Sequence, residues 1–420
     1  MNAQSRLYFS VIIILTLMLN VSAQEIPTAS PEAVGMSSER LRQIDTVMHR
    51  HIDAGEIQGA VTVVARRGKV VHFKAYGLMD VERGRAMEKD AIFRMASSSK
   101  PVLGVAAMMM IEEGLFDPTD EVAKYLPEFK DMQVAVLKEP EDEDISPKWV
   151  YGDVPEHRLV PAKRPITIHD LLTHTAGLGS EGLGSAVAKI PGPGLETTLA
   201  TQIPVYATMP LDFQPGTRWS YSPGVGLDVV ARIIEIVSGM SYDVFLRKRI
   251  FEPLGMTDTH FKLPPEKDSR RVVIHGLDAK AKNFKKDAET RYISASGGLS
   301  STAEDFLRFE QMLAHGGSLF GNQLLSPQSV ATMSSNQVGG LYHGKGKESG
   351  VGFGYTVAVV LDPAAAWNRR GRGAFGWGGA FGTTSWTDPT EEITAVLMVQ
   401  QNSKGMIYDF ENVIREAIID

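Results

Sequence analysis

The stretch FRMASSSK, residues 93–100, places a serine and a lysine three positions apart where a helix is expected to begin. Residues at i and i+3 share one face of a helix, whereas residues one or two positions apart do not. Lys100 can therefore reach the hydroxyl of Ser97 rather than those of the two serines between them. A serine hydroxyl needs a base before it attacks a carbonyl, and burial makes a lysine easier to deprotonate. Ser97 and Lys100 are thus candidates for covalent catalysis, although a serine before a helix is more often a simple cap.

The pattern upstream of this stretch predicts one helix and a pair of strands. Residues 38–54 have helical periodicity, and 59–66 and 69–76 are β-branched runs close enough to form a hairpin. Downstream, a helix is expected over 97–114, with a proline in its first turn, where a missing N–H costs nothing.

The patterns are mostly helical between 117 and about 290, and strands return after that. Residues 177–194 are rich in glycine and proline, which predicts an irregular loop. Residues 406–419 form a closing helix. The late predicted strands are 352–361, 373–377, 383–388 and 393–400.

This order of elements predicts a single catalytic domain over 24–420. Its sheet-containing parts, about 32–116 and 291–420, enclose a mostly helical insertion at about 117–290. One antiparallel sheet would then be built from both ends of the chain and covered by helices.

The composition is that of an ordinary globular protein, with 43% hydrophobic and 22% charged residues among 420 and a net charge of −7. No basic stripe is present, so nucleic acid is not an expected partner. The absence of cysteine excludes disulfides and thiolate nucleophiles.

The N-terminus predicts export. Arg6 precedes an apolar run over 7–19, and small residues end at Ala23, which together are typical of a cleaved signal peptide over 1–23. The protein would be periplasmic or secreted after cleavage near Ala23. An uncleaved anchor is the alternative, and no later stretch is apolar enough to span a membrane.

Five segments together resemble one known superfamily, that of class C β-lactamases, penicillin-binding proteins and family VIII carboxylesterases. They occur in the same order as in that superfamily, and the resemblance covers roughly residues 32 to 420. The segments are FRMASSSK (93–100), LLTHTAGL (171–178), FEPLGMTDT (251–259), SGGLSS (296–301) and GWGGA (376–380).

The resemblance implies three catalytic motifs, of which the first is Ser97-x-x-Lys100. The second is normally Tyr-x-Asn, and its candidate here is Tyr221-Ser-Pro223. Tyr221 is then the implied general base in acylation or the acid that protonates the leaving group. Pro223 departs from the motif because its side chain offers no hydrogen bond.

The third motif normally begins with a cation, and here it is Trp377-Gly378-Gly379. The resemblance implies that this strand edge binds substrate, and that the backbone N–H groups of Ser97 and Ala380 form the oxyanion hole. The tryptophan resembles that of family VIII esterases. Its presence in place of a cation favours an uncharged or aromatic substrate.

The implied fold is the β-lactamase/transpeptidase-like α/β fold, an antiparallel sheet flanked by helices with an inserted helical region. The implied function is that of a serine hydrolase acting through an acyl-enzyme on Ser97. A carboxylesterase for short-chain or aryl esters is the first hypothesis. A β-lactamase or D-Ala-D-Ala-type peptidase is the second, and a non-catalytic penicillin-binding-like protein, suggested by Pro223, is the third.

The expected partner is a small-molecule ester or amide, with no cofactor, and the oligomeric state is open. His169 and His174 are five positions apart, which is not the helical spacing of metal ligands, so they are expected to be structural. No metal site is predicted.

Overall fold

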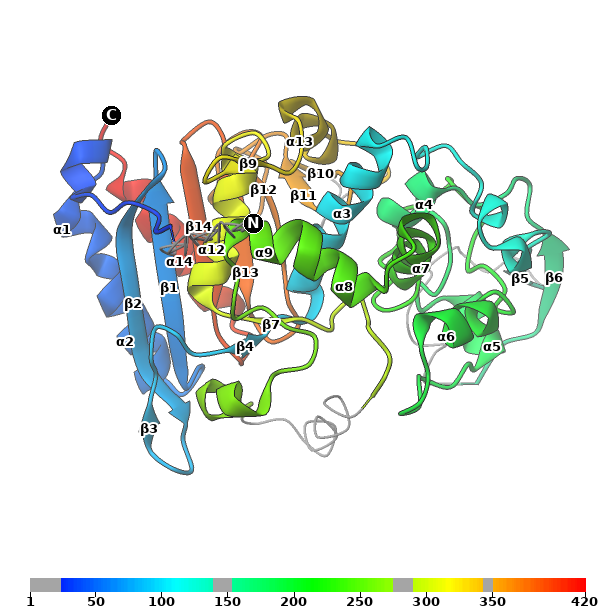
Figure 1. Ribbon diagram of the computed structural model, residues 1–420, viewed down its shortest axis with the longest axis horizontal. Coiled ribbons are helices and arrows are strands. Elements are labelled where there is room, and N and C mark those ends of the chain that lie inside the picture. Colours follow the sequence, from blue (N-terminus) through cyan, green and yellow to red (C-terminus); the bar gives the residue numbers. More distant parts are fainter. Residues whose placement is uncertain (1–23, 139–152, 275–289, 343–349) are drawn as a thin grey trace, which may run out of the picture.

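The computed structural model describes residues 24–138, 153–274, 290–342 and 350–420. Its centre is an eight-stranded antiparallel sheet in the order β10-β11-β12-β13-β14-β1-β2-β3. Figure 1 shows strands from the two ends of the chain, in blue and in orange to red, lying side by side. The strands of this sheet are β1 (Gly59–Arg66), β2 (Lys69–Asp80), β3 (Arg85–Ala86), β10 (Val351–Phe353), β11 (Ala358–Val360), β12 (Phe375–Gly378), β13 (Thr384–Asp388) and β14 (Ile393–Met398).

The junction between the chain ends is the pairing of β1 with β14, in which Val63 lies opposite Val396. Every residue of β1 is buried. Because side chains alternate along a strand, Val61 and Val63 pack into one core layer, whereas Ala60 and Val64 pack into a second layer on the other face. A strand buried on both faces explains why β1 is a nearly continuous apolar run.

Helices cover both faces of the sheet, as Figure 1 shows. The chain termini form one layer, with α1 (Ser38–Leu41), α2 (Gln43–Asp53) and α14 (Lys404–Ala417). The other layer contains α3 (Lys100–Glu112), α12 (Ala303–Ala314) and α13 (Pro327–Met333).

The region between α3 and α12 holds the remaining helices and a small hairpin. The hairpin is formed by β5 (Gln133–Leu137) and β6 (His157–Pro161), and β4 (Phe93–Arg94) pairs with β7 (Ser300–Ser301). Ser318–Leu319 (β8) and Asn322–Gln323 (β9) form a further short pair. The helices are α4 (Ile168–Leu172), α5 (Leu183–Ala188), α6 (Leu199–Tyr206), α7 (Gly226–Ser238), α8 (Tyr242–Leu246) and α9 (Glu252–Leu254).

Four predicted elements differ from the structure. The helix expected over 38–54 is two helices, α1 and α2, separated at Arg42. The strand expected over 352–361 is two strands, β10 and β11, because the chain turns back around Thr356, whose φ is 68°. The loop expected over 177–194 contains α5, in which Gly184 allows close packing, since a Cβ there would lie 2.2 Å from the carbonyl oxygen of Pro210. The helix expected from residue 97 begins instead with a 3-10 turn, Ala96–Ser99.

Within the described ranges, no helix combines the length and the apolar character needed to cross a bilayer. The predicted signal peptide, residues 1–23, lies outside the described residues. The domain boundaries remain a prediction, although the strands of the central sheet do come from residues 59–86 and 351–398.

Candidate active site

Ser97 lies in the 3-10 turn that leads into α3. In such a turn, side chains at i and i+3 are nearly eclipsed, and the Nζ of Lys100 is 3.2 Å from the Oγ of Ser97. The residue before the serine, Ala96, has a φ of 45°, a left-handed conformation that is strained for a residue with a Cβ. The fold therefore holds Ala96, the residue before the nucleophile, in a conformation that local sequence preference alone would not favour.

The two neighbouring serines face other parts of the molecule. The hydroxyl of Ser98 is 3.3 Å from the carbonyl oxygen of Thr383, to which it donates, and the hydroxyl of Ser99 accepts a hydrogen bond from the N–H of Leu299. Both are buried and anchor the turn. Of the three consecutive serines, Ser97 is the one in hydrogen-bond contact with Lys100.

Lys100 is completely buried, and its ammonium group is surrounded by acceptors. Besides approaching Ser97, Nζ donates to the carbonyl oxygens of Pro223, at 2.9 Å, and Ser296, at 2.6 Å. The proline that departs from the family motif thus still supplies an acceptor, through its backbone rather than its side chain.

Tyr221 approaches Ser97 from another side. Its hydroxyl is 2.7 Å from the Oγ of Ser97, and the Nζ of Lys100 is 5.0 Å from the centre of its ring. The serine oxygen is therefore in hydrogen-bond contact with both a phenol and an amine. This is an arrangement in which a proton can pass between the three groups.

The end of β12 lies against the Ser97 turn. The N–H of Gly379 donates to the carbonyl of Thr383, and the Thr383 hydroxyl donates to the carbonyl of Met95, at 3.1 Å. A Cβ on Gly379 would lie 2.3 Å from that same Met95 oxygen. A glycine is needed for this approach, which brings the backbone of Gly379 against the Met95 carbonyl, two residues before Ser97.

An aromatic cluster forms the wall behind Tyr221. The ring centres of Trp377 and Tyr221 are 5.6 Å apart, and Phe353 packs edge-on against Trp377 at 5.3 Å. Trp219 and Tyr342 extend this wall. Trp377, predicted to bind substrate, therefore also packs against the tyrosine of the second motif.

The two histidines contact aromatic side chains. His174 accepts a hydrogen bond at Nδ1 from the N–H of Ser222, and its ring centre is 4.9 Å from that of Tyr221. Burial, together with the charge of Lys100, holds the pKa of His174 well below its usual value, so the ring is neutral. His169 lies 3.2 Å from the hydroxyl of Tyr355. In the part of the chain that the structure describes, no three histidine or acidic side chains are grouped as metal ligands.

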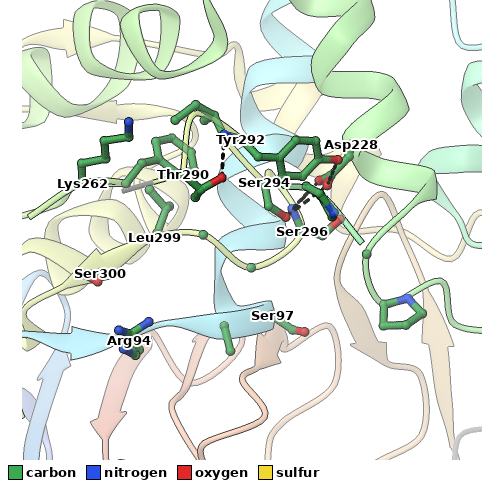
Figure 2. A pocket seen from close by; sticks show the side chains of 18 of the residues that line it. Arg94, Ser97, Asp228, Lys262, Thr290, Tyr292, Ser294, Ser296, Leu299 and Ser300 are labelled. Carbon is green, nitrogen blue, oxygen red and sulfur yellow. Dashed lines mark hydrogen bonds between the residues drawn. The ribbon is translucent and has the colours of Figure 1, made fainter. Parts of the chain in front are cut away.

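A cavity of about 640 Å³ extends from Ser97 (Figure 2). Apolar side chains such as Leu195, Phe261 and Phe381 line part of it. Basic side chains also line it, namely Arg94, Lys262 and Arg271, the last paired with Asp268. A second cavity, of about 500 Å³, borders Trp377, Gly378 and Gly379.

Sequence reasoning did not identify Asp228 or Tyr292, and it gave Ser296 only as the start of the segment SGGLSS, without a role. In the structure Ser296 binds Lys100, and Asp228 binds both Ser296 and Tyr292. Asp228 interrupts the apolar pattern of α7, and Tyr292 and Ser296 follow a region without clear periodicity. The one sequence signal for Asp228 was a charged residue on an otherwise apolar helix face. That signal does not show which residues the carboxylate would bind.

Comparisons with known proteins agree over nearly the whole chain. The family model described as Beta-lactamase matches residues 44–417. Protein Rv1367c of Mycobacterium tuberculosis is 33% identical over 369 residues, covering 83% of this chain and 87% of that protein. Esterase EstB of Burkholderia gladioli is 28% identical over 417 residues, covering 92% and 97%.

Among solved structures, EstCE1, described as a hydrolase with promiscuous acyltransferase activity, matches with a TM-score of 0.73. It is 26% identical, and the match covers 91% of this chain and 99% of that one. Together with the sheet and helix arrangement, these likenesses confirm the predicted family and fold class.

Proposed function

Since this chain belongs to the Beta-lactamase family and is a serine hydrolase, we propose that it is a carboxylesterase that cleaves short-chain or aryl esters through an acyl-enzyme on Ser97. The observation that carries this proposal is the position of the Ser97 oxygen, 2.7 Å from the Tyr221 hydroxyl and 3.2 Å from the Lys100 amine. The similarity to an esterase and the tryptophan at position 377 favour esters over β-lactams.

Acylation begins when the Oγ of Ser97 attacks the ester carbonyl and loses its proton to the Tyr221–Lys100 pair. The protonation states of these two groups depend on each other. The role of general base is therefore assigned to the pair rather than to one residue. The same proton then passes to the leaving alcohol as the tetrahedral intermediate collapses. Water attacks the acyl-enzyme by the same route in reverse.

The backbone N–H groups of Ser97 and Ala380 are proposed to hold the oxyanion. Support comes from the hydrogen bonds of Thr383, which tie the end of β12 to the Met95 carbonyl beside the nucleophile. Preorganised donors of this kind each contribute about 10²–10³ in rate. Ala380, just beyond the end of β12, is exposed.

The test compares hydrolysis of p-nitrophenyl butyrate and nitrocefin by the mature protein and by Ser97→Ala. We expect rapid ester turnover, little nitrocefin cleavage, and loss of both in the variant. Covalent labelling by a fluorophosphonate should occur on Ser97. Strong nitrocefin turnover would favour the β-lactamase alternative, and failure to label Ser97 would favour a non-catalytic protein.

Export also belongs to this proposal, and its support is the N-terminal pattern alone. Expression of the full chain in a bacterium, followed by fractionation and N-terminal sequencing, tests it. We expect a mature chain that begins at Gln24 in the periplasm or medium, whereas uncleaved protein in the membrane fraction would indicate an anchor.

A further inference from the structure

Asp228 is a buried acid that the mechanism above does not use. It is the third residue of α7, and its side chain is completely shielded from solvent. Its carboxylate accepts hydrogen bonds from the Tyr292 hydroxyl at 2.7 Å, the Ser294 hydroxyl at 3.1 Å and the Ser296 N–H at 2.9 Å. Figure 2 shows these three groups converging on it from one segment, 292–296.

This segment leads directly to the active site. The residue whose N–H is held by Asp228, Ser296, uses its own carbonyl to accept the hydrogen bond from Lys100. The start of α7 contributes a second acceptor, because the carbonyl of Pro223 lies just before the helix. Asp228 therefore fixes one of the two carbonyls that orient the lysine.

The charge of Asp228 also acts on Lys100. The hydrogen-bond partners that the described residues give this carboxylate are donors, which suits its ionised form. Burial raises the pKa of Asp228, while the hydrogen bonds and the positive charge of Lys100 oppose that rise. An ionised Asp228 and the positive charge of Lys100 therefore attract each other, and neutralising Asp228 removes that attraction.

The other titratable side chains described around Asp228 and Lys100 are tyrosines and His174. Burial raises the pKa values of Tyr206, Tyr242 and Tyr292, which face Asp228. His174, beside Lys100, is neutral for the reason given above. Within this group of described side chains, Asp228 is the one that supplies a negative charge when Tyr221 is protonated.

We propose that Asp228 is a positioning residue of the active site, which holds the Ser296 carbonyl against Lys100 and whose negative charge governs the pH dependence of Ser97 activation. The inference rests on the proposed function, because the pair must lose one proton before it can activate Ser97. The direction of the effect is the same whether that proton leaves from the tyrosine or from the lysine.

The test is the pH dependence of kcat/KM for p-nitrophenyl butyrate in the mature wild type, Asp228→Asn and Asp228→Glu. Asparagine can still accept the Ser296 hydrogen bond but carries no charge. The acid limb of the Asp228→Asn profile, in which kcat/KM rises with pH, should therefore move to lower pH by about one unit. Glutamate keeps the charge but displaces the 292–296 segment. Asp228→Glu should therefore lower the maximal kcat/KM and leave the acid limb at the wild-type pH.

Asp212→Asn is the matched control. Asp212 is also a buried carboxylate that accepts backbone hydrogen bonds, from Ser180 and Ser185 at 2.7 Å, but it binds the 180–185 segment rather than 292–296. Its acid limb should coincide with that of the wild type. An unmoved acid limb in Asp228→Asn, or an equal movement in Asp212→Asn, would overturn the proposal.

The rate of fluorophosphonate labelling against pH provides a second measurement, which needs neither a good substrate nor a fully folded sample, since the folded fraction alone reacts. A wild type that does not label would contradict the proposed function itself. If the wild type is labelled but the acid limb of Asp228→Asn coincides with that of the wild type, only the role of Asp228 is contradicted.

Discussion

At the scale of single residues, the active site depends on a few polar contacts made by a buried amine. Lys100 has no exposed surface, and the carbonyl oxygens of Pro223 and Ser296 satisfy two of its protons. A buried amine without such partners would be costly to hold charged. The third N–H group of the ammonium remains for the hydrogen bond to the Oγ of Ser97.

Tyr221→Phe should lose activity by about 10²–10⁴ in kcat, the usual contribution of a positioned acid or base. The variant keeps the ring that packs against Trp377 and His174 but removes the hydroxyl 2.7 Å from Ser97. Tyr342→Phe is the control, because Tyr342 belongs to the same aromatic cluster and contacts Trp219 rather than Ser97. Steady-state ester hydrolysis measures both, and equal losses would argue against a proton-transfer role for Tyr221.

Pro223→Asn restores the residue type of the family motif. The backbone carbonyl at position 223 already binds Lys100 in the native protein. We therefore expect ester kcat/KM to stay within about fivefold of wild type, since a hydrogen bond typically contributes about 1 kcal/mol net. A rise of several orders of magnitude would mean that the native proline makes this an impaired enzyme.

At the scale of elements, the site is assembled where the turn before α3, the approach to α7 and the end of β12 meet. The contact between β12 and the turn is made through backbone, with Thr383 joining Gly379 to Met95. Close backbone contact of this kind tolerates no side chain. The geometry of the proposed oxyanion hole thus depends on a glycine rather than on a functional group.

Gly379→Ala should reduce kcat/KM by about 10²–10³, the usual effect of losing one oxyanion donor. The added Cβ would lie 2.3 Å from the Met95 oxygen and push the strand end away from Ser97. Gly378→Ala is the control, since the atom nearest to its added Cβ, the carbonyl oxygen of Thr383, is 3.3 Å away. Ester kinetics should separate the two alanine variants, and similar activities would show that β12 need not lie so close to the turn.

At the scale of the whole molecule, a buried carboxyl joins a helix to the central sheet. Glu310 on α12 is 1% exposed and accepts a hydrogen bond from the Thr387 hydroxyl on β13 at 2.8 Å. Burial raises the pKa of Glu310 to about 7 from its usual value of 4.5. The folded protein therefore holds this proton over a range of pH in which the unfolded chain has already lost it.

Glu310→Gln should make the protein more stable at pH 8 than the wild type. Because the folded pKa is raised, wild-type stability falls as pH rises from about 4.5 to about 7, and the glutamine removes that loss. The gain should be roughly 1–3 kcal/mol at pH 8 and close to zero at pH 4.5. Urea unfolding at the two pH values measures it. The exposed Glu304→Gln on the same helix serves as control, and a gain independent of pH would refute the assignment.

The sequence alone determined the nucleophile candidate, the family and the order of elements. Those features depend on local spacing, such as the three positions from Ser97 to Lys100, and on short motifs. Both can be read from the sequence without knowing the fold. Local periodicity also located β1, β2 and α14 to within a few residues.

Only the tertiary structure decided which groups surround Lys100. The carbonyl of Pro223 lies 123 positions from it, and that of Ser296 lies 196 positions away. Backbone carbonyls carry no residue-specific signal, so no motif could indicate them. Asp228 was hidden for a related reason, since its partners come from a segment 64 to 68 residues later in the chain. Chain folding, rather than residue type, brings these groups together, because a buried charge must find its partners wherever the core places them.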